Sequence, residues 1–181
     1  MKHLKVLTYF LVCMCASVAV IAAASSHSST VDAKLAELKV ELPPVTAPIA
    51  SFVHCVRTGN LIFVSGQLPT KDGKNMEHIG QLGDQVTTED GAKAAQLCVL
   101  NVLAKLKAEI GSLDKVKRCV KLTCFVSSTN KFTDHPKVAN GASDLIVQIF
   151  GEAGKHARAA VGVSSLPLGV SVEVEAVFEV E

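Results

Sequence analysis

A nearly strict alternation of apolar and polar residues at the C-terminal end limits the fold of this chain more than any other feature. Residues 170–181 read VSVEVEAVFEVE, a pattern of period two that is typical of a β-strand. One face of this strand would carry Val172, Val174, Ala176, Phe178 and Val180, and the other Glu173, Glu175 and Glu179. Such a strand belongs to a sheet that is covered on its apolar face and bears carboxylates on the other.

Two helices are indicated upstream of this strand. In the TTED motif Thr87 precedes Asp90 by three residues, a variant of the capping box, and apolar residues then recur at helical spacing as far as Gly111. A second helix is expected over residues 136–150, with Pro136 in its first turn. Each helix has an apolar face that the sheet would cover.

Four more strands are expected. Residues 51–57 and 60–66 flank a TGN turn and predict a hairpin. Residues 114–126 and 158–163 predict the other two. In the first of these, one face would carry Val116, Arg118, Val120, Leu122, Cys124 and Val126, and the wet face Lys117, Cys119, Lys121 and Phe125.

The element order β-β-α-β-α-β-β predicts an α+β fold, with one mixed or antiparallel sheet and two helices on a single face. So few helices leave the other face of the sheet without a cover. Other copies of the chain are the natural cover, so we expect a homo-oligomer. The domain would span residues 51–181, preceded by a lead-in over residues 29–50 whose proline-rich part cannot lie inside a sheet.

Residues 1–28 differ from the rest. A short basic stretch is followed by an uncharged apolar run over residues 6–24, which is typical of a secretory signal peptide cleaved near Ala24. The secretory pathway is therefore the expected location. An uncleaved membrane anchor, a mitochondrial presequence and a misassigned start remain alternatives, and contact with a membrane is expected only if the segment is retained.

The charge balance argues against a nucleic acid partner. Residues 1–28 contain two of the chain's 18 basic residues and none of its 17 acids, so the remainder is close to neutral. Aromatic residues make up only 4% of the chain, which leaves little for stacking bases. The sequence has no CxxC or HxxxH pair and no glycine-rich phosphate motif, so we expect no metal and no cofactor.

Cysteine spacing favours free thiols over disulfides. Cys55, Cys98, Cys119 and Cys124 remain after the leader, an even number that a disulfide framework would also have. Their spacings are irregular, and Cys98 falls on the apolar side of its predicted helix. A core of this size does not need a disulfide.

A few polar residues stand out as candidate site residues. Arg158 enters a run of small apolar residues that resembles a buried strand, with no acid in the next ten positions. Ser65 and Gly66 end a strand, where backbone and hydroxyl groups can approach a ligand. Each has a plainer interpretation: an ordinary strand exit for Ser65 and Gly66, and for Arg158 an ion pair with Glu173 or another acid. For His54, His135 and His156, a surface or edge position explains each residue at least as well as a catalytic role does.

Three stretches, RTGNLIFVSGQLP, DHPKVANGASDLIVQIFGEAGKHARAAVGVSSLPLGV and VEVEAVF, together resemble the YjgF/RidA-like family of reactive intermediate deaminases, also labelled L-PSP endoribonucleases. The resemblance runs from about residue 33 to the C-terminus. It implies a chorismate-mutase-like fold and a homotrimer, with the sheets turned inward and a cleft between each pair of subunits.

The same resemblance assigns roles in the cleft. Arg158 would bind the carboxylate of a small 2-imino or 2-enamino acid such as 2-aminoacrylate, and Glu173 would position water. Ser65, Gly66 and Asn140 would contact the ligand. At two further positions the deaminases commonly have tyrosine and cysteine, where this chain has Phe52 and Ala160.

The resemblance therefore implies hydrolysis of such acids to 2-oxo acids and ammonia, without a cofactor. Because Phe52 and Ala160 supply neither a phenol nor a thiol, a trimer that binds a small carboxylate or a protein partner without turnover is the alternative. Endoribonuclease activity fits the charge and aromatic content least well.

Overall fold

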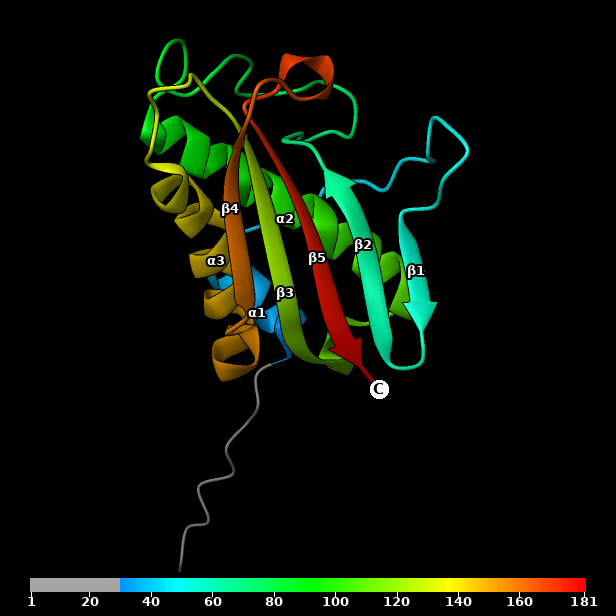
Figure 1. The fold of residues 1–181 in the computed structure, drawn as a ribbon. Helices are drawn as coiled ribbons and strands as arrows, with labels where there is room; N and C mark the ends of the chain where they lie inside the picture. Colours follow the sequence, from blue (N-terminus) through cyan, green and yellow to red (C-terminus); the bar gives the residue numbers. More distant parts are fainter. Residues whose placement is uncertain (1–29) are drawn as a thin grey trace, which may run out of the picture.

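A five-stranded sheet runs through the part of the chain that the structure, a computed structural model, describes, residues 30–181 (Figure 1). The strands lie in the order β1-β2-β5-β3-β4, and β3 and β4 form the one parallel pair among them. Their bounds are Cys55–Thr58 for β1, Leu61–Gln67 for β2, Val116–Ser127 for β3, Ala157–Val163 for β4 and Val172–Val180 for β5. The sheet is therefore mixed, one of the two arrangements expected.

The helices cover one face of this sheet. Helices α2 (Thr88–Ile110) and α3 (His135–Phe150) lie behind the strands in Figure 1, and the short α1 (Val31–Glu37) packs at their side. Three 3₁₀ turns link the elements, at Leu113–Lys115, Gly151–Gly154 and Pro167–Gly169. The α+β architecture with two long helices on a single face is confirmed.

The ends of α2 follow the predicted signals. The side chain of Thr87 accepts a hydrogen bond from the Asp90 N–H at 3.1 Å, and the Thr87 hydroxyl also contacts the Asp90 carboxylate at 3.0 Å. At the other end Gly111 adopts a φ of 84°, a conformation that glycine takes without steric cost. The cap residues thus define this helix within one residue of the prediction.

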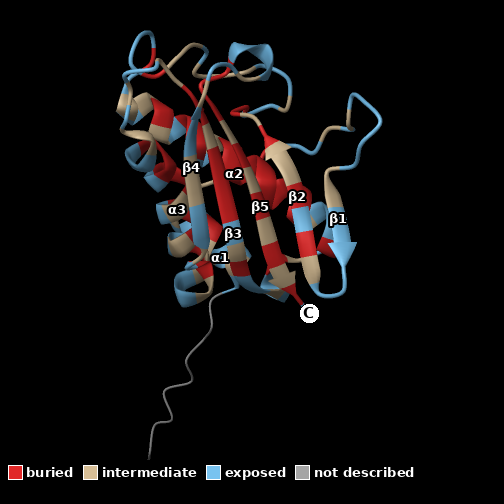
Figure 2. Cartoon of the chain, in the orientation of Figure 1, coloured by how far each residue is buried: buried red, intermediate tan, exposed pale blue. Residues whose placement is uncertain are grey.

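The core lies between the helices and the sheet. Strand β5 shows the predicted alternation: its apolar set points into the core and its glutamates do not (Figure 2). The largest fully buried side chains include Phe178 from β5, Ile62 from β2, and Leu103 and Leu106 from α2. Burial of this shared apolar surface is the main force that joins the two layers.

Two strand predictions are wrong in detail. Strand β1 begins at Cys55, not at residue 51, because residues 51–54 form a bent segment in which the His54 ring contacts the Thr46 carbonyl at 2.9 Å. In β3 the pairing register with β5 shifts between Cys119 and Lys121. This irregularity reverses the alternation in the first half of β3, so Cys119 is buried in place of Val120, and Arg118 is exposed.

The four cysteines of the described residues are free, as expected. Burial raises the pKa of the Cys119 and Cys124 thiols to about 12 each, so neither forms a thiolate near neutral pH. Residues 30–181 include no helix long and apolar enough to cross a membrane. The predicted leader, residues 1–28, lies outside the described residues.

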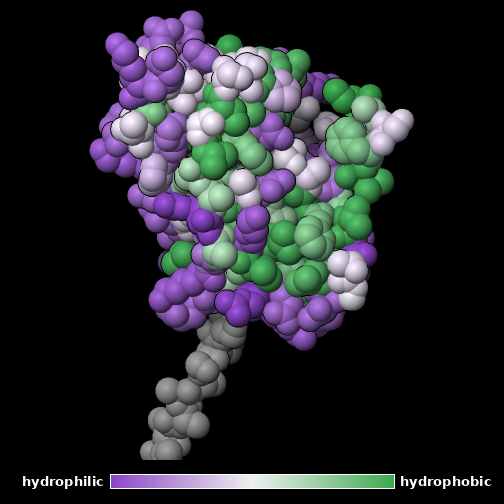
Figure 3. Space-filling view, in the orientation of Figure 1, coloured by the Kyte–Doolittle hydropathy of each residue, from purple (hydrophilic) through white to green (hydrophobic). Residues whose placement is uncertain are grey.

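The second face of the sheet, which we call the open face, carries exposed apolar side chains (Figure 3). They include Val56 of β1, Phe63 of β2 and Val161 of β4, which are 55%, 46% and 42% exposed. Neighbouring strands therefore present large apolar groups to solvent in the single chain. The cover expected from other copies of the chain stays a prediction.

Candidate functional site

The first group of candidate residues lies where β2 reaches β5. Val64 pairs with Ala176 and Gln67 with Val174, so Ser65 and Gly66 together face the single residue Glu175. This β-bulge interrupts the ladder at the position where the sequence predicts backbone and hydroxyl contacts.

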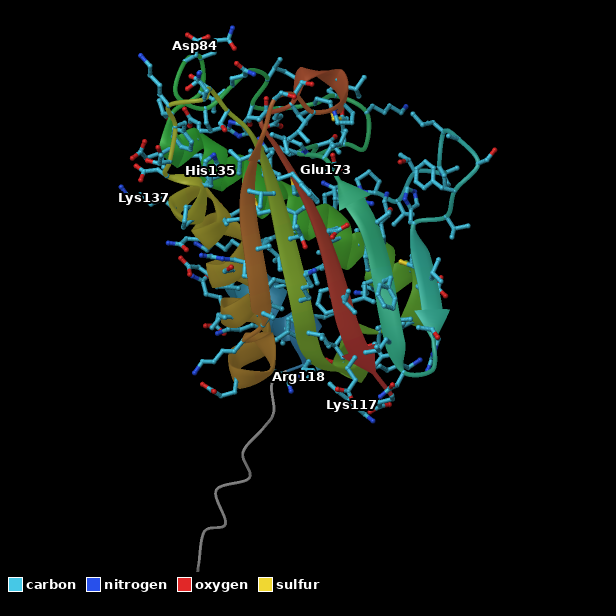
Figure 4. The ribbon with its side chains drawn as sticks, in the orientation of Figure 1. Asp84, Lys117, Arg118, His135, Lys137 and Glu173 are labelled. Carbon is cyan, nitrogen blue, oxygen red and sulfur yellow. The ribbon has the colours of Figure 1, made fainter. Side chains whose placement is uncertain are left out.

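Glu173 lies directly over Gly66. A side chain of any kind at position 66 would collide with the Glu173 carboxylate, so the glycine makes room for this acid. Figure 4 shows Glu173 beside the end of β2. Burial, and to a lesser extent the charge of Glu175, raise the pKa of the half-buried Glu173 carboxyl. Within residues 30–181 no hydrogen bond reaches this carboxyl, which leaves it free to exchange a proton with a bound molecule.

The Ser65 hydroxyl is oriented by a neighbour. The Gln67 side-chain amide donates to the Ser65 carbonyl at 3.1 Å and to the Ser65 hydroxyl oxygen at 3.2 Å. Because the hydroxyl oxygen already accepts, its own hydrogen can be donated to a ligand on the open face. Gln67 is a positioning residue that the sequence analysis missed.

The second group surrounds Arg158 on β4. One guanidinium nitrogen donates to the Asn140 side-chain oxygen at 2.9 Å and to the Ser143 hydroxyl at 3.0 Å, both on α3. No carboxylate among the described residues forms an ion pair with Arg158. Its charge is therefore held in place by neutral groups and remains available to an anion.

His156 extends this network. Its Nδ1 lies 2.6 Å from the Gly154 carbonyl and its Nε2 lies 3.1 Å from the Ser143 hydroxyl. A carbonyl only accepts, so Nδ1 carries the proton, and in the neutral ring Nε2 accepts from Ser143. The Ser143 oxygen then accepts from Arg158, which fixes the direction of each bond. His156 is thus more than an edge residue.

Ser143 was not predicted from the sequence, although a signal for it exists. Ser143 follows Asn140 by three residues on a helix, so the two side chains share one face. Likewise His156 and Arg158 are two residues apart at the start of a strand, and both reach α3. Spacing alone identifies neighbours, but only the packing of β4 on α3 shows that they meet.

The two groups lie on opposite faces of the sheet. Arg158 pairs with Leu122, whose side chain is fully buried on the helix side, whereas Glu173 points to the open face. Strand β3 also separates β4 from β5, and adjacent strands are about 4.8 Å apart. One chain therefore does not bring Arg158 and Glu173 together, and the predicted ion pair between them does not form within it.

The remaining predicted residues divide between the two groups. Asn140 and Ala160 belong with Arg158, since Ala160 is two residues farther along the same face of β4. Phe52 belongs with Gly66: both line a small cavity, and the Phe52 ring packs edge-on against His54 with centroids 5.8 Å apart. The described residues contain no cluster of three His, Cys, Asp or Glu side chains that could hold a metal ion.

Known proteins with a similar chain agree with this architecture. The family model described as "YjgF/chorismate_mutase-like, putative endoribonuclease" matches residues 32–179. Protein TCP17 of Trypanosoma cruzi is 49% identical over 154 residues, which cover 84% of this chain and 95% of that protein. A 2-iminobutanoate/2-iminopropanoate deaminase of Dermatophagoides farinae is 26% identical over 142 residues, or 78% and 95% of the two chains.

A solved structure is similar as well. The crystal structure of a protein with unknown function from Agrobacterium tumefaciens superimposes with a TM-score of 0.76 at 42% identity, covering 84% of this chain and 94% of that one. The family match extends over nearly all the described residues and both groups of candidate residues. The chain therefore belongs to the YjgF/chorismate-mutase-like family.

Proposed function

We propose that this protein hydrolyses small 2-imino and 2-enamino acids to 2-oxo acids and ammonia, in clefts formed between copies of the chain. The observation that carries the proposal is the state of Arg158: a guanidinium held by Asn140 and Ser143, with no acid partner among residues 30–181. A planar guanidinium binds a carboxylate through two parallel hydrogen bonds. The name of the deaminase relative from Dermatophagoides farinae supports the same chemistry.

The proposal needs more than one subunit. Arg158 and Glu173 lie on opposite faces of the sheet, so a cleft that contains both must combine the Arg158 group of one copy with the Gly66 and Glu173 group of another. The exposed apolar side chains of the open face supply a surface for such an assembly. We propose a homotrimer, which light scattering would test: a mass of one chain in solution would contradict it.

The chemistry requires no cofactor. Arg158 binds the substrate carboxylate, and Glu173 takes a proton from a water molecule whose oxygen adds to C2 of the imine. The former C=N electron pair takes up a proton at nitrogen, which gives a carbinolamine. The amino nitrogen then takes up a second proton, the C–N bond breaks and ammonia leaves with the electron pair, and loss of the hydroxyl proton balances the proton taken up and leaves the 2-oxo acid. An enamine enters the same route after protonation at C3.

Glu173 suits this role because its environment disfavours the charged form. Burial raises the pKa of its carboxyl, which makes it a better base when ionised and an acid nearer to neutral pH when protonated. Gly66 leaves the carboxylate room beside the bulge, and Ser65 offers a directed hydroxyl hydrogen.

The direct test is ammonia release from freshly generated 2-aminoacrylate, compared with spontaneous decay. We expect acceleration at micromolar protein concentration, and its loss in Glu173→Gln. Glu179→Gln is the matched control, because Glu179 lies on the same face of β5 and its carboxylate accepts from Asn60 at 3.1 Å. Absence of acceleration in the wild-type protein would contradict the proposal.

A second function is supported by Phe52 and Ala160. These residues supply no phenol and no thiol at two positions of the proposed cleft, so the same assembly could bind a small 2-oxo acid or a protein partner without turnover. This alternative predicts that 2-oxobutyrate raises the melting temperature while 2-aminoacrylate decays at its spontaneous rate. If 2-oxobutyrate caused no shift, the small-acid form of this alternative would be contradicted.

A further inference from the structure

Lys105 of α2 is buried in a way that lysine rarely is. Its side chain is only 4% exposed, and no hydrogen bond or ion pair joins it to any residue in the described range 30–181. Lys107, two residues later, pairs instead with Asp32 at 2.6 Å in an exposed position. The ammonium nitrogen is not among the described side-chain atoms that are shut off from solvent without a partner, so the aliphatic part of Lys105 is buried while its charged end stays accessible to a bound molecule.

The immediate surroundings supply no counter-ion. Burial raises the pKa of the nearby Cys55 thiol to about 11, so this group is a neutral thiol at physiological pH. Glu109, one turn farther along α2, is exposed and forms no ion pair with Lys105. The Asn101 amide is already engaged, since its nitrogen donates to the Thr70 and Leu97 carbonyls at 2.7 and 2.9 Å.

Lys105 lines a cavity of about 190 Å³ that adjoins the proposed cleft. Gly66 and Phe52, both assigned to the cleft, line the same cavity, as does His54. The Nε2 atom of His54 lies 2.9 Å from the Thr46 carbonyl, whereas its buried Nδ1 has no partner among the described residues. A buried ring nitrogen without a partner and a lysine without an ion pair thus line the same small cavity, which indicates a polar occupant.

We propose that Lys105 binds an anionic group at the far end of the ligand, so that this cavity selects 2-imino and 2-oxo acids with a second carboxylate. The inference rests on the proposed function, because it places the C2 end of the ligand at Gly66 and Glu173. Lys105 would then be a specificity-determining residue at the end of the ligand that neither Arg158 nor Glu173 contacts.

The selection has a physical basis. A ligand with an apolar tail would place methyl or methylene groups against an ammonium that then keeps no hydrogen-bond acceptor, and this loss counts against binding. A carboxylate at the same place forms a charge-assisted hydrogen bond. Bonds of this kind contribute enough to separate the two ligands by about 10- to 150-fold in affinity.

The test compares two probes that have the same number of carbon atoms. The dissociation constants of 2-oxopentanoate and 2-oxopentanedioate are measured by calorimetry on the full chain. We expect the dicarboxylate to bind at least 10-fold more tightly to the wild-type protein. Lys105→Met should abolish this preference without weakening 2-oxopentanoate, and Lys107→Met should retain it.

Every outcome bears on the inference. Equal binding of the two acids to the wild-type protein, or a preference that survives in Lys105→Met, would overturn it while leaving the proposed function intact. If neither acid bound, both the proposed cleft and the inference would fail. Because the Lys105 ammonium forms no ion pair or hydrogen bond within the described residues, Lys105→Met should fold, and Lys105→Gln serves as a second variant.

Discussion

The two groups of candidate residues are held in place by different means. Arg158 is exposed and is held by hydrogen bonds to Asn140 and Ser143, whereas Glu173 is half-buried and receives no hydrogen bond within the described chain. In the Arg158 group, hydrogen bonds to neutral partners fix the orientation of the guanidinium. In the Glu173 group, burial raises the pKa of the carboxyl, so the protonated form is favoured. Under the proposed function, we therefore expect the Arg158 group to govern affinity and the Glu173 group to govern the rate of turnover.

The largest expected effect is on the rate of turnover and tests the role of Glu173. Glu173→Gln keeps the size of the side chain but removes its ability to take up a proton, so turnover of 2-aminoacrylate should fall about 10²- to 10⁴-fold. Binding of 2-oxobutyrate, measured by calorimetry, should change less than about threefold, since the carboxylate anchor is untouched. A lost affinity with unchanged turnover would reverse the assignment.

Arg158→Lys tests the affinity side. Lysine keeps the charge but not the two parallel hydrogen bonds, so 2-oxobutyrate should bind about 10- to 150-fold more weakly. Thermal unfolding should barely change, because the guanidinium pairs with no acid of its own chain among residues 30–181. Arg158→Ala should likewise keep its oligomeric state. If Arg158→Ala dissociated while Arg158→Lys bound normally, Arg158 would be a structural residue.

Ser143→Ala tests how much the hydrogen bonds of Arg158 contribute to ligand affinity, because it leaves Arg158 in place and removes one of its two acceptors. The Ser143 hydroxyl also contacts His156 at 3.1 Å, so the substitution separates Arg158 from the histidine. Loss of one hydrogen bond should weaken 2-oxobutyrate binding about 2- to 12-fold. Ser164→Ala, on a serine outside this network, is the control and should have no effect. An unchanged affinity in Ser143→Ala would show that Asn140 alone suffices.

The smallest expected effect is a pH dependence of the stability of the folded chain. Because burial raises the pKa of Glu173, this carboxyl keeps its proton to a higher pH in the folded chain than in the unfolded chain. The contribution of Glu173 to stability is therefore fully present at pH values below the unfolded pKa and is lost as pH rises through the folded pKa. Relative to Glu173→Gln, the wild-type protein should lose stability as the pH rises from below the ordinary glutamate pKa of 4.5 toward neutral, measured by thermal unfolding. An opposite slope would mean that the carboxylate is stabilised in the folded state.

Much of the fold could be predicted from local patterns. The alternation in residues 170–181 identified β5 and its buried face, and the Thr87 and Gly111 signals bounded α2. The pattern failed at β3, where an irregular pairing with β5 exchanged the environments of Cys119 and Val120. A bulge depends on the partner strand, so no local pattern in β3 reveals it.

The candidate site divides in the same way. Arg158 and Gly66 could be selected from residue type and position at a strand end, whereas the role of Glu173 followed only from the family resemblance. Ser143, Gln67 and Lys105 were missed, since serine, glutamine and lysine in these segments look like ordinary surface residues. Lys105 in particular follows Asn101 by one turn of α2, and the cavity it lines forms where the segment around residues 46–54, the end of β2 and the loop that follows β2 meet α2.

By itself the sequence determined the α+β class, the order of the elements and the side of β5 that is buried, because these follow from periodicities of two and 3.6 residues along the chain. Only the tertiary structure decided that Arg158 and Glu173 lie on opposite faces, that Arg158 is held by neutral partners and that Lys105 has none. These properties depend on how β4 packs on α3 and how β2 pairs with β5. They arise from contacts between residues that are distant in sequence, and the local periodicity of a segment does not predict such contacts.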